Sequence, residues 1–294
     1  MLIRYIPLLL LSLPGLADYQ SGVNALQKGN AASALREFSA SADSDARAAH
    51  ALAELYERGN GTPQDYAKAL DLYRRAAEKG LAPAQVSLGY LYERGYGTRR
   101  DYAQALRWYQ KAAAQGNAMA FNNLGVLFEN GWGVKQDFRQ AVDWYRKAVD
   151  LSLPIAQTNL GYAYAEGRGV PKDLPQAILL YRKAADAGDA QGMNNLGWMY
   201  AIGQGVERNS DSARQWYERA AERGHGQAMV NLSRMYETGQ GVPADEKRAL
   251  DWLTRAAQVK YRPAMQRLAK IYRNGGLGLS PDPALASDWE RQLN

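Results

Sequence analysis

Apolar and polar positions follow a helical period along most of the chain, and the same arrangement returns at a fixed interval. In the segment 84–116, Ala84, Leu88 and Leu91 fall in one narrow arc at 100° per residue, which is typical of an amphipathic helix packed on one side. A G-x-G motif follows, and its second glycine recurs every 36 residues, at Gly61, Gly97, Gly133, Gly169, Gly205 and Gly241. This unbroken period predicts a stacked array of helix hairpins.

Each repeat is predicted to hold two helices joined by a glycine turn. The first helix has a small residue at the border of its apolar stripe, where we expect two helix backbones to approach closely: Gly89, Gly125, Gly161, Gly197, Ser233 and Ala269. The G-x-G is interpreted as a left-handed C-cap and not a phosphate-binding loop, because no strand precedes it and no third glycine follows. The second helix carries Trp108 and Tyr109 on its packing face, so we expect such aromatic pairs in the core.

An acidic or amide side chain stands where the second helix of each repeat begins. These residues are Asp65, Asp101, Asp137, Asp173, Asn209 and Asp245. We interpret them as N-caps, because the side-chain oxygen can accept an unpaired backbone N–H of the first turn. Gln104, Gln140 and Gln176 lie three residues further on, at the spacing of a capping box. A calcium loop would need clustered oxygen ligands, and each of these acids stands alone.

The full unit reads A-x-x-x-L-G-x-L-Y-x-x-G-x-G-[VT]-x-x-D-x-x-x-A-x-x-W-Y-x-K-A-A-x-x-G and resembles the Sel1-like repeat, a relative of the tetratricopeptide repeat. The resemblance covers about residues 46–289. It implies an all-α fold, an α-solenoid formed as a right-handed superhelix of antiparallel helix hairpins, with the first helices lining the concave side. We expect four segments: a signal peptide (1–17), N-terminal capping helices (18–45), six repeats (46–261) and a C-terminal variant repeat or cap (262–294).

The first 17 residues have the pattern of a secretory signal. Arg4 precedes an apolar run over 8–13, and Gly15 and Ala17 occupy the −3 and −1 positions of a cleavage site, so we expect cleavage after Ala17 and a periplasmic or secreted protein. The apolar run is too short to span a bilayer, and no membrane span is expected. There is no cysteine, which excludes disulfides and thiolate chemistry. The net charge of +6 favours an acidic protein or an anionic polymer, and export argues against nucleic acid as the partner.

The sequence contains no recognisable catalytic constellation. Its two histidines, His50 and His225, lie in different repeats and are interpreted as ordinary surface or helix-end residues. Neither a G-x-S-x-G turn nor an H-E-x-x-H helix is present. We therefore expect no enzyme, no cofactor and no metal site.

Positions that differ between repeats on an exposed face are candidates for binding a partner. On the side of the first helix opposite its apolar stripe, one column changes from aromatic to basic and is predicted to bind a partner in the groove: Tyr90, Val126, Tyr162, Trp198, Arg234 and Lys270. A neighbouring column is expected to face the same groove: Val86, Asn122, Thr158, Asn194, Val230 and Gln266. Trp, Tyr and Arg dominate interface hot spots. The alternative is that stacking of adjacent first helices buries the aromatic members.

Two further sets have two interpretations each. The asparagine ladder, Asn123, Asn159, Asn195 and Asn231, either grips an extended peptide backbone or satisfies polar groups of the adjacent repeat. The basic C-terminal patch, with Lys260 before it, is either a solvated face or a seat for an acidic partner: Arg262, Arg267, Lys270 and Arg273.

These observations favour an exported, non-enzymatic adaptor that binds another protein in its concave groove. The resemblance to Sel1-like proteins implies several roles of this kind. One is an inhibitor or immunity protein that neutralises a periplasmic effector toxin. The alternatives are a periplasmic regulator or scaffold for signalling or polysaccharide secretion, or a cell-wall glycan-binding module that uses the exposed aromatic residues.

Overall fold

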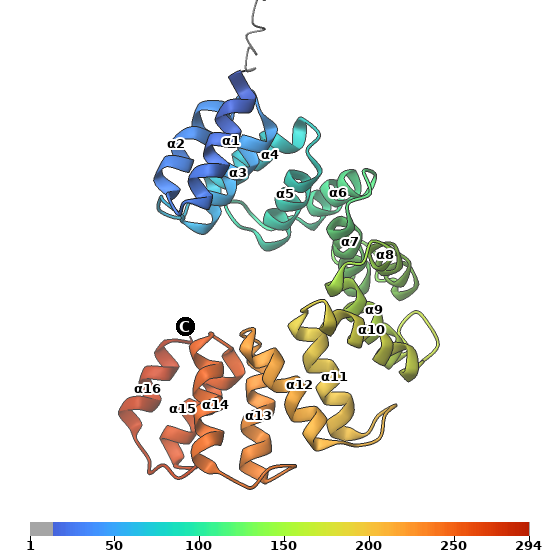
Figure 1. Cartoon of the computed structure of the whole chain (residues 1–294), viewed down its shortest axis with the longest axis vertical. Coiled ribbons are helices and arrows are strands. Elements are labelled where there is room, and N and C mark those ends of the chain that lie inside the picture. The colour runs from blue at the N-terminus through green and yellow to red at the C-terminus, as the bar shows by residue number, and fades with distance from the viewer. Residues whose placement is uncertain (1–13, 294) are drawn as a thin grey trace, which may run out of the picture. The chain divides into compact units, whose positions relative to one another are not determined.

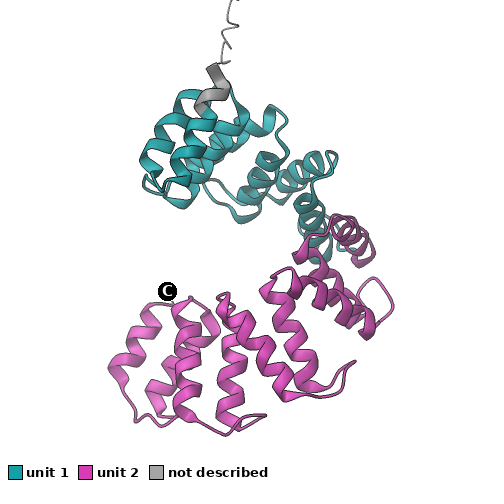
Figure 2. Cartoon of the chain, viewed as in Figure 1, with its two compact units in different colours: residues 1–137 teal, residues 138–294 magenta. Residues whose placement is uncertain are grey.

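The computed structural model describes residues 14–293, which form sixteen α-helices joined by short turns (Figure 1). The chain divides into two compact units, residues 1–137 and 138–294 (Figure 2). Unit 1 contains α1 (Pro14–Gln27), α2 (Ala31–Ser41), α3 (Ala46–Arg58), α4 (Tyr66–Glu78), α5 (Ala82–Arg94), α6 (Tyr102–Ala113) and α7 (Ala118–Asn130). Unit 2 contains α8 (Phe138–Asp150), α9 (Pro154–Glu166), α10 (Leu174–Asp186), α11 (Ala190–Ile202), α12 (Ser210–Glu222), α13 (Gly226–Thr238), α14 (Glu246–Gln258), α15 (Arg262–Asn274) and α16 (Pro283–Arg291).

Within each unit, consecutive helices pack against one another as hairpins. The first helix of each repeat, odd-numbered from α3 to α15, is called the A helix, and the second, even-numbered from α4 to α16, the B helix. In unit 1, α4 contacts both α3 and α5, and in unit 2, α12 contacts both α11 and α13. The predicted all-α solenoid of helix hairpins with a 36-residue period is confirmed. None of the helices in the described part of the chain has the length and apolarity to cross a bilayer.

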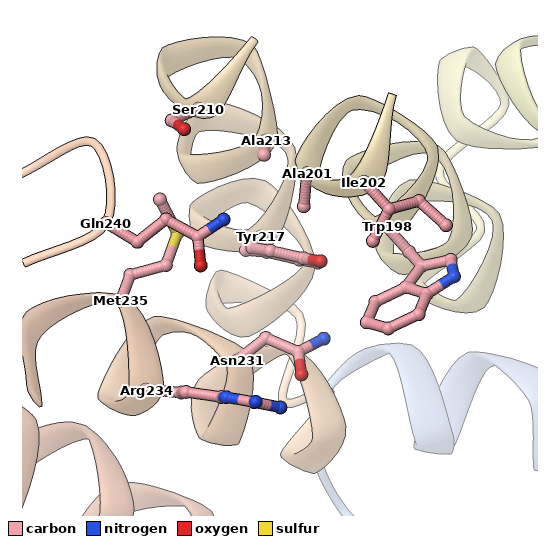
Figure 3. Close-up of a pocket in the computed structure, with 10 residues that line it drawn as sticks. All are labelled: Trp198, Ala201, Ile202, Ser210, Ala213, Tyr217, Asn231, Arg234, Met235 and Gln240. Atoms are coloured by element: carbon pink, nitrogen blue, oxygen red, sulfur yellow. The ribbon is translucent and has the colours of Figure 1, made fainter. Parts of the chain in front are cut away.

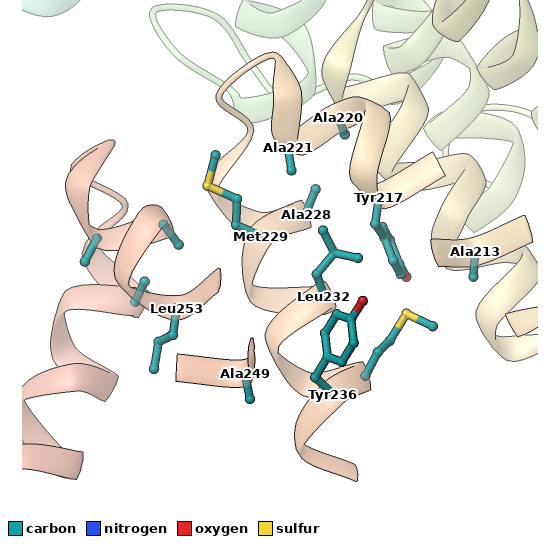
Figure 4. Close-up of a cluster of buried hydrophobic side chains, with 14 of the residues drawn as sticks. Ala213, Tyr217, Ala220, Ala221, Ala228, Met229, Leu232, Tyr236, Ala249 and Leu253 are labelled. Atoms are coloured by element: carbon teal, nitrogen blue, oxygen red, sulfur yellow. The ribbon is translucent and has the colours of Figure 1, made fainter. Parts of the chain in front are cut away.

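Each unit has a core of alanines, leucines and tyrosines supplied by the facing sides of A and B helices. In unit 2 the Tyr217 ring lies beside Leu232 and Ala213, all buried (Figure 4). The aromatic pair divides between core and surface, which the sequence pattern did not predict. Tyr109 is completely buried, whereas Trp108 is half-buried with the Lys111 ammonium 4.1 Å from its ring centroid. The tyrosine therefore packs the core, and the tryptophan is covered by a cation on the outer side.

The small position of the A helix makes room for a tyrosine ring. A Cβ added at Gly89 would lie 2.6 Å from the ring of Tyr109, and one at Gly197 would lie 2.8 Å from Tyr217. The expected approach of two backbones is also present, since a Cβ at Gly197 would lie 3.2 Å from the Ala213 carbonyl oxygen, but the tightest contact is with the aromatic ring. In the repeat where Leu253 replaces the tyrosine, Ser233 stands at the small position and donates to the Ala249 carbonyl at 2.7 Å.

The turn between the helices follows the predicted local rules. Gly95 ends α5 in the left-handed conformation, and its N–H donates to the Leu91 carbonyl at 2.8 Å. A Cβ at Gly97 would lie 2.3 Å from the Tyr66 carbonyl oxygen, so this second glycine permits contact with the preceding B helix. Asp101 accepts the Gln104 N–H at 3.0 Å and caps α6 as predicted.

The other half of the capping box is not formed at this helix. The Asp101 N–H donates to the Tyr92 carbonyl at 2.9 Å, so it does not need the Gln104 side chain. Asp173 behaves in the same way, with its N–H bonded to the Tyr164 carbonyl at 2.9 Å. At these two helices the acid caps the helix as predicted, whereas the glutamine does not complete the capping box.

The chain ends differ from the regular repeats. Helices α1 and α2 precede the first repeat, and Ala34 and Phe38 are completely buried, where later repeats place an alanine and an aromatic residue. Most of the predicted signal peptide 1–17 lies outside the described residues. At the other end, a loop with a bridge between Gly276 and Leu279 joins α15 to the nine-residue helix α16.

Candidate functional site

The predicted partner-binding column lies on the A helices, and its exposure differs between the units. In unit 1, Tyr90 and Val126 are half-buried, whereas the four members in unit 2 are exposed. Trp198 has 48% of its surface exposed and Tyr162 has 38%. The alternative that stacking buries these aromatic residues is therefore wrong for unit 2.

Trp198 is the freer of the two exposed aromatic rings. The Arg168 guanidinium lies 5.0 Å from the centroid of the Tyr162 ring and covers it. Among the described residues no cation or aromatic ring covers Trp198 in this way, and Ile202, one helical turn further along α11, is also exposed. The two residues form an apolar exposed surface on α11.

A pocket of about 150 Å³ opens beside Trp198 (Figure 3). It is lined from α11, α12, α13 and the turn after α13: Trp198, Ala201, Ile202, Ser210, Ala213, Tyr217, Asn231, Arg234, Met235 and Gln240. Figure 3 shows the side chains of Tyr217, Asn231 and Arg234 pointing toward the space beside the Trp198 ring. Arg234 is the one charged residue of this lining, so the pocket is positively charged.

The polar groups of this pocket are only partly satisfied. Asn231 accepts from Gln227 at 3.0 Å and donates to the Asn194 oxygen at 2.9 Å. By contrast, neither the Arg234 guanidinium nor the Tyr217 hydroxyl has a hydrogen-bond or ion-pair partner within residues 14–293. Burial raises the pKa of Tyr217, so its hydroxyl stays protonated and able to donate.

The same tyrosine is paired in unit 1. The Tyr109 hydroxyl donates to Glu93 at 2.9 Å, and the Tyr73 hydroxyl donates to Glu57 at 2.6 Å. In unit 2, Ala201 precedes Tyr217 at the position that Glu93 holds before Tyr109. Ala201 lines the pocket. Sequence reasoning did not single out Ala201 or Tyr217. The signal was present as a column that changes from Glu57, Glu93 and Glu129 to Ala165 and Ala201 while the tyrosine sixteen residues later stays constant.

Three polar members of the neighbouring column expected to face the groove are buried, whereas its last polar member, Gln266, is exposed. Asn122, Thr158 and Asn194 are each under 7% exposed. Thr158 donates to Asp189 at 2.7 Å, which in turn caps α11 by accepting the Gly192 N–H. The expectation of exposure is therefore wrong for these three residues, and two of them bond to the next repeat, Thr158 to Asp189 and Asn194 to Asn231.

The asparagine ladder lies half-buried between the A helices and the tyrosine hydroxyls. The Asn123 side chain lies beside the Tyr109 hydroxyl, and the Asn195 side chain beside the Tyr181 hydroxyl. Asn231 instead reaches Asn194 of the previous repeat. These contacts favour the interpretation that the ladder satisfies polar groups of neighbouring helices.

Acidic partners within the chain offset part of the basic C-terminal patch. Arg273 forms an ion pair with Glu290 at 2.7 Å, and Arg267 pairs with Glu237. Arg262 donates to the Leu293 carbonyl at 3.0 Å. Lys270 is the exposed member of the patch for which the described residues provide no partner. The patch therefore offers less free charge than its sequence implies.

The two histidines have structural surroundings. His225 caps α13, because its Nδ1 accepts the Ala228 N–H at 3.2 Å, while Nε2 lies 3.0 Å from Gln191 Oε1. His50 lies within α3 and is half-buried, with its ring centroid 5.3 Å from that of Tyr73, so it is neither at a helix end nor fully exposed. Burial lowers the pKa of both. Within the described residues, no three His, Cys, Asp or Glu side chains gather as a metal site would require.

The comparisons with known proteins agree with this architecture. The model of the Sel1 repeat matches residues 46–81, 82–117, 118–153, 154–189, 190–225, 226–259 and 262–289. A comparison with curated protein sequences found no match.

Solved structures provide three informative neighbours. A Sel1 repeat protein of Oxalobacter formigenes is 34% identical with a TM-score of 0.67, over 82% of this chain and 94% of that one. The protective antigen c5321 of uropathogenic Escherichia coli is 38% identical with a TM-score of 0.63, over 88% of this chain and 56% of that one. The immunity protein Pa5087 of Pseudomonas aeruginosa is 26% identical with a TM-score of 0.55, over 72% of this chain and 83% of that one. The chain belongs to the Sel1 repeat family.

Proposed function

We propose that this protein is an exported, non-enzymatic adaptor that binds another protein through the A-helix face of unit 2. The observation that carries the proposal is the exposed Trp198 ring beside Arg234, whose guanidinium has no partner among the described residues. A tryptophan and an arginine at the edge of a pocket are the residue types that contribute most to protein interfaces. The family resemblance predicts that this face is the concave one.

Export is the part of the proposal that rests on the sequence of residues 1–17. The pattern of Arg4, the apolar run and the small residues before Asp18 supports a cleaved signal. N-terminal sequencing of the protein recovered from the periplasm tests it, with Asp18 as the expected first residue. Recovery of the uncleaved chain in the cytoplasm would refute export.

Affinity capture from periplasmic extract tests the adaptor role. We expect the parent chain to retain a protein partner that a Tyr162→Ala, Trp198→Ala, Arg234→Ala variant loses. A matched control carries Leu179→Ala and Lys183→Ala on the exposed side of α10 and should retain the partner. Binding of the purified partner should weaken roughly 30-fold in Kd for Trp198→Ala alone, since a hot-spot residue contributes about 2 kcal/mol. Equal retention by all three forms would move the interface away from this face.

A more specific role as an immunity protein is supported by one comparison. The P. aeruginosa protein Pa5087 has a similar fold and is described as an immunity protein. If this chain acts in the same way, the captured partner should be toxic when directed to the periplasm, and co-expression of this chain should suppress the toxicity. A partner without toxicity would favour the regulatory or scaffolding alternative.

Glycan binding is the weaker candidate. It would use Tyr162 and Trp198 as stacking platforms, but Arg168 covers the Tyr162 ring. Saturable binding to peptidoglycan fragments that is lost in a Tyr162→Ala, Trp198→Ala double variant would favour it over the adaptor.

A further inference from the structure

The pocket beside Trp198 coincides with a position that other repeats fill from within the chain. In the hairpin α5–α6, the Glu93 carboxylate occupies the site next to the B-helix tyrosine and accepts its hydroxyl hydrogen at 2.9 Å. Glu93 is 8% exposed there. In the hairpin α11–α12, Ala201 provides only a methyl group, and the equivalent space is open and lined by Tyr217. The fold therefore contains an occupied and an unoccupied version of the same site.

The unoccupied version has gained a positive charge. Arg234 lies on α13, the A helix that follows the α11–α12 hairpin, and the equivalent residue after the α5–α6 hairpin is Val126 of α7. Arg234 is exposed and has no ion-pair partner in the described part of the chain. No acidic residue lines the pocket. An arginine and a tyrosine hydroxyl are both hydrogen-bond donors, and a carboxylate accepts from both.

The tyrosine also lacks a neighbouring asparagine amide. The Asn123 side chain lies beside the Tyr109 hydroxyl, and the Asn195 side chain beside the Tyr181 hydroxyl. The corresponding Asn231 is instead held by Gln227 and Asn194, at 3.0 and 2.9 Å. The Tyr217 hydroxyl thus points into the pocket as a donor with no acceptor in residues 14–293 (Figure 3).

We infer that this pocket binds the side-chain carboxylate of a glutamate from a protein partner. The carboxylate accepts from the Tyr217 hydroxyl, as Glu93 does from Tyr109, and pairs with Arg234, while the exposed Trp198 ring covers the methylene groups. The volume of about 150 Å³ is about ten times the ~10–15 Å³ that one water molecule requires, so the group fits. A glutamate is favoured over a chain-terminal carboxylate because a glutamate side chain already occupies the equivalent site in the α5–α6 hairpin.

Small probes test the site without knowledge of the partner, although the inference itself rests on the proposed protein-binding role. The full chain, labelled with ¹⁵N, is titrated with N-acetyl-glutamate N-methylamide while the Trp198 indole N–H is followed by NMR. The Trp198→Phe variant assigns this signal among the seven tryptophans. We expect saturable shifts and an apparent affinity at least about tenfold higher than for N-acetyl-glutamine N-methylamide, which lacks the charge. N-acetyl-glutamine with a free terminal carboxylate should also bind more weakly, and tighter binding of that probe would overturn the choice of a glutamate side chain.

Variants separate the pocket from general charge attraction. Arg234→Gln and Tyr217→Phe should each reduce the response at least about fivefold, because each removes one donor to the carboxylate. Lys183→Gln removes the same charge from the exposed side of α10 and should leave the response unchanged. Ala201→Glu supplies the carboxylate from within the chain and should abolish probe binding.

Two outcomes would overturn the inference. One is an equal response to the glutamate and glutamine probes, and the other is an unchanged response in both Arg234→Gln and Tyr217→Phe. The proposed function fails separately, in the capture experiment. Probe binding without a captured protein would count against the adaptor role alone, whereas a captured partner that binds the Ala201→Glu variant as tightly as the parent would count against the pocket alone.

Discussion

The hairpins α5–α6 and α11–α12 have the same backbone plan and differ in the residue beside the buried B-helix tyrosine. In α5–α6, Glu93 closes the space above Tyr109, and in α11–α12, Ala201 leaves the space above Tyr217 open. Both tyrosines are almost completely buried, so the change does not affect the helix packing that defines the repeat. The comparison shows that the core tyrosine can stay unchanged between two hairpins while the glutamate beside it is replaced by alanine, which leaves a pocket.

The largest expected effect tests whether the two hairpins share their packing. We expect Gly89→Val and Gly197→Val each to lower the free energy of unfolding by about 2–3 kcal/mol, because a Cβ would lie 2.6 or 2.8 Å from the tyrosine ring. Urea denaturation followed by circular dichroism measures the loss. Met119→Val, at an exposed site of α7, controls for helix propensity. A much smaller loss at Gly197 than at Gly89 would show that the open hairpin packs more loosely.

The loss of stability on removing the tyrosine hydroxyl should differ between the two hairpins. Tyr109→Phe leaves the buried Glu93 carboxylate without its donor and should cost about 1–3 kcal/mol of stability. Tyr217→Phe removes a hydroxyl that has no partner within residues 14–293 and should change stability by less than about 0.5 kcal/mol. Adding Glu93→Ala to Tyr109→Phe should cost less than the sum of the single changes, since the two groups form one interaction. An equal loss of stability in Tyr109→Phe and Tyr217→Phe would contradict the view that only the Tyr109 hydroxyl has a partner that matters for stability.

A third comparison concerns the caps of two A helices. Asn117 caps α7, and His225 caps α13 at the same repeat position through its neutral Nδ1. Burial lowers the pKa of folded His225, so the unfolded chain takes up a proton first as the pH falls below the ordinary value of 6.5. The contribution of the His225 cap to stability should therefore be fully present above pH 6.5 and decrease as the pH falls toward 5.

His225→Asn should remove this decrease by keeping the cap at every pH. We expect the parent to lose about 1 kcal/mol relative to the variant between pH 7 and pH 5, the usual contribution of an N-cap. Thermal unfolding at both pH values measures the difference, and His50 titrates in both proteins and cancels. Identical pH profiles would show that the imidazole does not act as the cap.

The elements that sequence reasoning predicted correctly depend on local rules. Gly95 ends its helix in the left-handed conformation, and Asp101 caps the next helix, because each needs only neighbours within a few residues. The repeat period extended these rules along the chain. The exposed column in unit 2 was also identifiable, since Trp198 and Arg234 lie opposite the apolar stripe of their helices.

The pocket was harder to predict because its signal is a difference between repeats. Ala201 is unremarkable on its own and becomes informative only beside Glu93 and an unchanged tyrosine. The prediction that the neighbouring polar column is exposed was wrong for another reason. Asn122 and Asn194 lie on the border of the apolar stripe, where the distance to the adjacent A helix decides between exposure and burial, and a single-helix projection contains no such distance.

The smallest effect concerns the last repeat, where the same two positions carry an ion pair. Arg273 stands at the position of Glu93, and Glu290 at that of Tyr109 after allowance for the one-residue insertion in the last loop. Their side chains lie 2.7 Å apart and are 55% and 43% exposed, so water and salt screen the attraction. A double-mutant cycle with Arg273→Ala and Glu290→Ala should give about 0.5 kcal/mol at low salt and close to zero in 1 M NaCl. The coupling between Glu93 and Tyr109 should persist in the same salt, because Glu93 is buried and its bond to the tyrosine hydroxyl is shielded from ions. If 1 M NaCl removed the Glu93–Tyr109 coupling as well as the Arg273–Glu290 coupling, burial would not explain the difference between the α5–α6 hairpin and the α15–α16 hairpin.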